Sequence, residues 1–143
     1  KALGSPEGAV AVALYEAVTT GAPVVALVGA RVYEVLPRGR LTLPCVRLDP
    51  PHLYPSAASG MGRFAWELTV MLHVWSEART HAAAQAIVSA LTAALHVQRL
   101  VVTGYTMLDC ACEAVDAFSE PDADVPDRVL RHHVALYRLT VQA

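Results

Sequence analysis

The chain has 143 residues, which suits one compact domain and is too short for two well-formed ones. Hydrophobic residues make up 55% of it and charged residues 17%, where an ordinary soluble domain has about 25% charged. This composition excludes disorder and predicts either a large core or apolar surface that partners bury. The net charge of −2 excludes a basic nucleic-acid-binding surface.

Apolar runs such as Ala22–Ala30 are far shorter than the roughly 18–20 residues that a membrane span needs. The first residues contain no apolar signal core, so we expect an intracellular protein. The three cysteines, Cys45, Cys110 and Cys112, are too few and odd in number for a disulfide framework.

Two helices are predicted at the start of the chain. Ser5 suits the N-cap of the first helix, Pro6 its first helical position and Gly21 its end. The second helix is predicted over Pro23–Val28, again with a proline at its start and a glycine after it.

Short extended segments come next, over Arg31–Leu36 and Pro44–Leu48. Pro50–Gly62 is rich in proline, glycine and serine and is predicted to be a loop. Arg63–Ser76 alternates apolar and polar residues over a dozen positions, which predicts a strand with one buried face. By parity Trp66 belongs to the core, whereas Trp75 lies on the other face, at the core edge or at an interface.

The second half of the chain predicts one long helix and two strands. Thr80 is expected to cap a helix over His81–His96, and strands follow over Tyr105–Val115 and Val129–Val141. An acidic turn, Ser119–Arg128, joins the two strands. We therefore predict a single α+β domain over residues 1–143, with a mainly antiparallel sheet and with the long helix and N-terminal helices packed on one face.

Four stretches carry a resemblance to a known family, and together they cover nearly the whole chain. They are Gly29–Glu34, Leu43–Leu48, Glu67–Ala78 with the Ala-rich helix after it, and Arg128–Val141. In order and spacing they resemble the tail-completion, or tail-terminator, proteins of long-tailed bacteriophages and gene transfer agents. The longer Pro50–Gly62 loop and the Cys-x-Cys sequence depart from that pattern.

The resemblance implies a ring-forming subunit, typically one of six, that caps the head-proximal end of the tail tube and stops tube polymerisation. Its partners would be copies of itself, the tail tube protein and a head-side stopper or connector protein. DNA would pass through the lumen without sequence-specific binding. The resemblance also implies a virion protein of the neck or tail, assembled in the host cytoplasm, with no enzymatic activity, no catalytic residue, no cofactor and no membrane contact.

Carboxylates recur on the polar faces of the predicted strands. If those faces coincide in the sheet, they form an acidic surface that would repel DNA phosphates inside a ring. Our hypothesis is that four acidic residues help to line the lumen: Glu67, Asp109, Glu113 and Asp116. The alternative is an ordinary solvated sheet face.

Two segments are candidates for contacts between subunits or rings. Asp122 and Asp124 in the acidic turn either dock an Arg-bearing neighbour or serve only to solubilise a hairpin tip. The predicted loop either contacts the tail tube or an adjacent ring, or has no partner. The loop residues concerned are His52, Leu53, Tyr54 and Met61.

A metal site is the weaker interpretation of the cysteines. Cys110 and Cys112 point to one face of their strand, and a tight hairpin would bring Cys112 near His132, but a fourth ligand is missing. Two small buried side chains are the commoner use of this pattern, so we expect no metal. The chain contains no nucleophile or phosphate-loop motif. The remaining alternatives are a head-completion ring, that is a stopper or connector, and a small soluble ligand-binding domain with a pocket.

Overall fold

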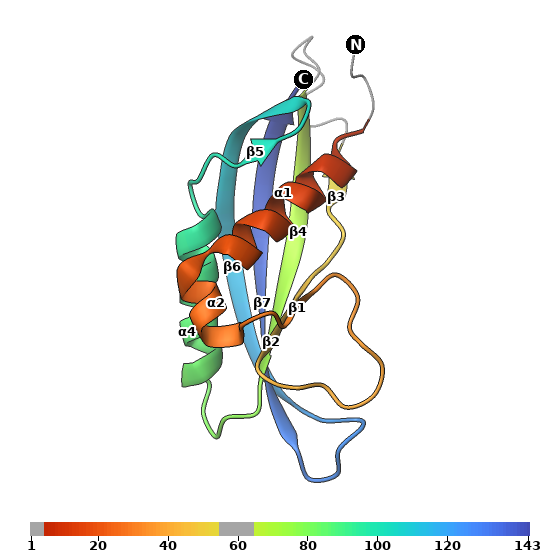
Figure 1. Cartoon of the computed structure of the whole chain (residues 1–143), viewed down its shortest axis with the longest axis vertical. Helices are drawn as coiled ribbons and strands as arrows, with labels where there is room; N and C mark the ends of the chain where they lie inside the picture. Colours follow the sequence, from red (N-terminus) through yellow and green to blue (C-terminus); the bar gives the residue numbers. More distant parts are fainter. Residues whose placement is uncertain (1–4, 55–64) are drawn as a thin grey trace.

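The computed structural model describes residues 5–54 and 65–143, which form three helices and one seven-stranded sheet (Figure 1). The helices are α1 (Glu7–Thr20), α2 (Ala22–Val28) and α4 (Ala82–Leu95). The strands are β1 (Val32–Tyr33), β2 (Cys45–Leu48), β3 (His52–Tyr54), β4 (Ala65–Ser76), β5 (Val101–Val102), β6 (Tyr105–Pro121) and β7 (Val129–Gln142). The α+β class predicted from the sequence is confirmed.

The sheet has the order β1-β2-β4-β7-β6-β5, and β3 pairs with the first half of β4. Its centre is the antiparallel β4–β7 pair, which runs without interruption from Ala65 opposite Gln142 to Ser76 opposite Arg131. Among the described strands only β1 and β2 pair in parallel, so the sheet is mixed rather than wholly antiparallel, and it curls into a half-barrel.

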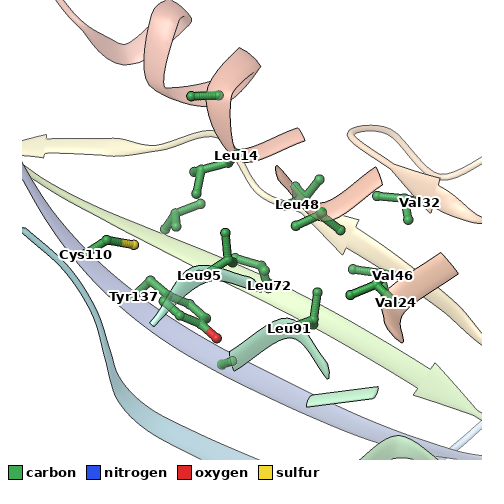
Figure 2. Packing of buried hydrophobic residues seen from close by; sticks show 14 of the residues in the cluster. Leu14, Val24, Val32, Val46, Leu48, Leu72, Leu91, Leu95, Cys110 and Tyr137 are labelled. Atoms are coloured by element: carbon green, nitrogen blue, oxygen red, sulfur yellow. The ribbon is translucent and has the colours of Figure 1, made fainter. Parts of the chain in front are cut away.

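All three helices pack on one face of the sheet, where the even-numbered residues of β4 and the odd-numbered residues of β7 form the core. Figure 2 shows Leu91 and Leu95 of α4 near Tyr137 of β7, with Leu14 of α1 in the same cluster. The Tyr137 side chain is fully buried, and its hydroxyl donates to Thr92 Oγ1 at 3.4 Å. Burial of these side chains fixes which face of the sheet meets the helices.

The helix boundaries differ in detail from the predicted ones. Pro6, not Ser5, is the N-cap of α1, and no side chain caps that end. At α4 the Thr80 hydroxyl accepts from the Ala82 N–H at 3.3 Å, as a capping residue should, although the N-cap itself is His81. The helix α4 has 14 residues, the same number as α1, so the description of it as the long helix is not supported.

The strands also differ from the predicted ranges. β6 continues six residues past the predicted end at Val115, because the long β7 offers it pairing partners up to Val129. The turn is therefore shorter than Ser119–Arg128. Within the predicted Pro50–Gly62 loop, residues 52–54 form β3, since β4 extends beyond the end of β2 and leaves an edge to pair.

The two tryptophans lie on opposite faces of β4, as parity predicted. Trp66 packs on the main core and meets Tyr105 edge to face at 5.6 Å between ring centroids. Trp75 is buried with Cys45 and Leu130 in a second, smaller cluster on the opposite face. The apolar side chains that cover this second cluster are Tyr33, Leu36, Leu41 and Leu43.

Within the described part of the chain, no single helix is both long and apolar enough to cross a membrane, although α1 and α2 would qualify as a pair bent by 74°.

The fold predicts a sharp contrast between two identical substitutions in strands. Val74 of β4 is fully buried and Val101 of β5 is 90% exposed. Val74→Ala should lower the free energy of unfolding by about 2 kcal/mol, through lost burial and an unfilled cavity. Val101→Ala should change it by less than about 0.5 kcal/mol. Urea denaturation followed by circular dichroism measures both, and equal losses would contradict the assigned core.

Candidate assembly site on the open face of the sheet

The face of the sheet opposite the helices, called the open face here, gathers the polar residues of three central strands. The β4–β7 and β6–β7 registers place Glu67, Thr140 and Asp109 side by side, and likewise His73, Val134 and Asp116. Directly opposed residues in antiparallel strands point to the same face. The predicted coincidence of the polar faces of β4 and β6 is therefore seen in the register.

One arginine pairs with half of the predicted carboxylate set. Arg138 of β7 contacts Glu67 at 2.8 Å and Glu113 at 3.0 Å, so it bridges β4 and β6 across the strand between them. The hydrogen bonds that Arg138 donates to Glu67 and to Glu113 raise the pKa of Arg138 above its usual value. Because all three groups are substantially exposed, solvent screens this triad, and its main effect is to fix the orientation of the side chains.

The other two carboxylates remain free. Asp109 and Asp116 are exposed, and neither forms an ion pair within residues 5–54 and 65–143. The net negative charge of the open face on β6 therefore comes mainly from these two aspartates.

A chain of four polar side chains crosses the open face from β2 to β6. His73 Nε2 lies 2.8 Å from Asp49 Oδ2, and His73 Nδ1 lies 2.8 Å from His132 Nε2. His132 Nδ1 in turn lies 2.5 Å from Glu120 Oε1. The four residues come from the end of β2 and from β4, β7 and β6, so this histidine relay ties together strands that are distant in sequence.

Burial lowers the pKa of His132, which favours its neutral imidazole, although the nearby Glu120 opposes this shift.

Aromatic rings and a guanidinium enclose the relay. Trp75 stacks on His132 with ring centroids 4.5 Å apart and on His73 at 5.4 Å, and Phe118 meets His132 edge to face. Arg47 lies 5.3 Å from the Trp75 ring and donates to Asp49 at 2.9 Å. These contacts fix the orientation of the relay side chains, and the relay links the strands of the sheet through polar contacts.

The predicted contact segment 52–54 has its side chains on two faces. His52 and Tyr54 are exposed on the open face, with ring centroids 4.6 Å apart, whereas Leu53 packs against the main core. Leu53 therefore contributes to the core of its own chain and is not exposed on the open face. Met61, the fourth residue of that prediction, lies outside the described residues.

The two aspartates of the predicted docking turn are not equivalent. Asp122 contacts Arg128 at 3.0 Å and its side chain is only 10% exposed, so it is occupied within its own turn. Arg128 also contacts Glu77 at 3.5 Å and donates to the Leu41 carbonyl at 3.0 Å. Asp124 is exposed and forms no ion pair in the described part, which leaves it as the available member of the pair.

The zinc arrangement weighed from the sequence is wrong. Cys112 lies opposite Tyr137, whereas His132 lies opposite Phe118 and points to the other face of the sheet. Burial raises the pKa of Cys110 to about 12, so its thiol stays protonated and is a poor metal ligand. Among the described residues, no group of three or more His, Cys, Asp or Glu side chains is placed to hold a metal ion.

A surface depression of about 610 Å³ lies between α1 and the segments that flank β2. Its lining residues are Glu7, Gly8, Ala11, Glu34, Val35, Leu48, Pro50 and Pro51. This lining is mainly apolar, and Glu7 and Glu34 are its charged members.

The sequence analysis did not predict the relay, since it considered His132 only as a metal ligand and gave His73 no role. The parity of β4 does place His73 on the polar face. No local signal, however, indicates that His132 and Glu120 lie beside it. Only the register between β4, β7 and β6 brings them together.

Comparison with known proteins identifies the class and then the family. A chain in the solved virion of a native gene transfer agent particle shares this fold, with a TM-score of 0.83 and 25% sequence identity over 97% of this chain and 98% of that one. The present chain belongs to the family described as tail completion protein gp17, whose sequence model matches residues 12–140. The resemblance to tail-completion proteins is thereby confirmed. No curated protein matches the chain.

The buried His133 makes stability depend on pH. Burial, and then the neighbouring His81 at 2.9 Å, lower the pKa of His133 below the value of about 6.5 expected in the unfolded chain. The unfolded state then binds protons more readily, so the contribution of His133 is fully present above about pH 6.5 and is lost as the pH falls below it. Between pH 7.5 and 5.5, thermal melts of His133→Gln should lose less stability than those of the unsubstituted chain. Equal losses of thermal stability in the two proteins would contradict a lowered pKa of His133.

Proposed function

We propose that this chain is a virion tail structural protein that forms a ring, most simply of six copies, at the head-proximal end of a tail. The observation that carries the proposal is the family match over residues 12–140, which covers nearly the whole chain. The fold shared with a chain of a gene transfer agent virion supports it. The ring would end tube polymerisation and offer its other surface to a head-side stopper or connector protein.

Surface chemistry supports an assembly role rather than an enzymatic one. Apolar side chains are exposed on several elements, including Val12 of α1, Val25 of α2 and Phe118 of β6. Covering such side chains with a partner removes apolar surface from water and lowers the free energy. With the family match, these surfaces favour a protein that acts by contact with copies of itself and with the tail tube.

Within this ring we propose that the open face lines the channel through which DNA passes. The Arg138 bridge leaves Asp109 and Asp116 as free carboxylates, while Glu67 and Glu113 would contribute as members of the bridged triad. A lumen with this charge repels phosphates, so DNA slides without adhering.

The location is tested by cryo-electron microscopy of particles that contain the chain. We expect a ring of this chain between the last tail-tube ring and the head-side proteins, and tails of uncontrolled length when the chain is omitted. A ring inserted within the head connector would favour the stopper alternative. Normal tails and joined heads without the chain would refute the proposed function.

The lumen role predicts that a charge reversal at Asp109 slows DNA transfer. Asp109→Lys places a cation beside the passing phosphates in every copy, so particles should assemble but deliver DNA about tenfold less efficiently at low salt, with recovery at high salt. The matched control reverses the charge of an exposed residue on α1, Glu16→Lys, and should transfer DNA normally. Equal behaviour of both variants would refute the lumen assignment.

A further inference from the structure

The second half of β6 is a sheet edge that the described part of the chain leaves open. On the outer side of β6, β5 pairs only with Tyr105 and Thr106. The next stretch is covered by Val97, whose N–H donates to the Cys110 carbonyl at 2.7 Å, and by His96, whose Nδ1 accepts from the Cys112 N–H at 3.0 Å. Beyond Ala114, no described backbone pairs with this side.

The same contacts show which residues direct their backbone groups outward. Cys110 and Cys112, which bond outward, oppose Leu139 and Tyr137 of β7. The alternation continues along β7, so the next residues of β6 to bond outward are those opposite Ala135, His133 and Arg131. These residues are Val115, Ala117 and Ser119.

From Ala114 to Ser119 this edge has no proline, lysine or bulge, three of the features by which monomeric proteins protect a sheet edge, although Asp116 gives it one charge. Glu113 to Ser119 are exposed, with Val115 and Phe118 each 45% exposed, and the segment contains no proline or lysine. Both register irregularities of β6 lie before Ala114, so neither interrupts the free stretch. An exposed, regular edge with apolar side chains is a template for strand pairing.

The opposite edge of the sheet is β1, at the same level. The registers align Tyr33 with Arg47, His73, Val134 and finally Asp116, across all five strands. Following the strand directions across the sheet, β1 runs antiparallel to β6. A second copy placed beside the first in the same orientation therefore brings its β1 alongside the free edge of β6 in antiparallel register, which is the stronger kind of pairing.

Charge selects this head-to-tail arrangement over pairing of β6 with β6. From Tyr105 to Pro121, β6 carries four carboxylates and no lysine or arginine, so two β6 edges would repel each other. The segment from Arg31 to Arg40 carries three arginines and one glutamate. Arg38 and Arg40 are exposed and form no ion pair in the described part.

We infer that neighbouring copies of this chain join head to tail, with β1 of one copy and the residues after it pairing with the free edge of β6, Ala114–Ser119, of the next. The inference rests on the proposed ring. An unlike pair of edges is a heterologous contact, which closes into a ring when the rotation between copies permits. The sheets then continue from copy to copy, with the open faces on one side.

Crosslinking tests the contact directly. Glu34→Cys and Val115→Cys, combined with Cys112→Ser, place two exposed thiols on the opposite edges; Cys45 and Cys110 remain buried. Within one copy the edges are four strand spacings apart, about 19 Å, beyond the reach of a short bismaleimide. Particles carrying this variant should give a ladder of covalent oligomers on a denaturing gel. The control with Ala83→Cys on α4 in place of Glu34→Cys should give none. Monomer alone from the edge pair would overturn the inference.

A backbone variant tests the strand pairing itself. Ala117→Pro removes one outward N–H at an edge, whereas the matched Ala117→Thr keeps it. The proline variant should lower the fraction of chain in rings at least tenfold with an unchanged circular dichroism spectrum, and the threonine variant should assemble normally. Normal assembly of both would overturn the inference. Crosslinking reports the contact wherever the chain lies in the particle and microscopy reports its location, so this inference and the proposed function fail separately.

Discussion

The uninterrupted pairing of β4 with β7 is the constraint on which the rest of the structure depends. Twelve consecutive pairs fix the alternation of both strands, and the helices cover the face on which the even residues of β4 lie. A slip of one residue would turn the slipped strand over, so either Leu72 or Tyr137 would point away from the helices and a charged residue of that strand would lie under them. Burial of one face therefore determines which side chains lie on the other face.

The polar network of the open face is a consequence of that alternation. Histidines on two neighbouring strands meet only because the register aligns Trp75 with His132 and places His73 within reach of both. The relay then links β2 with β6, although these strands do not pair. Contacts between side chains of four different segments favour one arrangement of the half-barrel over others.

The two edges of the sheet differ in how much of the chain covers them. At the β1 end, the chain folds back over the second cluster and covers Trp75. On the β6 side, pairing with β7 extends the strand to Pro121, and residues 113–119 are exposed. This asymmetry distinguishes one end of the sheet from the other, as head-to-tail assembly requires.

The sequence by itself determined the elements and the buried face. Alternation over Arg63–Ser76, the glycine after each of the first two helices and the apolar stripe of α4 are local signals, and each has a local physical cause. The order of these elements was also enough to indicate the family. Pairing partners lie far apart in the chain, so no local pattern reports them. Only the tertiary structure decided the remaining features, because burial of one face fixes the register between distant strands. These features are the extension of β6 to Pro121, the face on which His132 lies, the Arg138 bridge and the histidine relay.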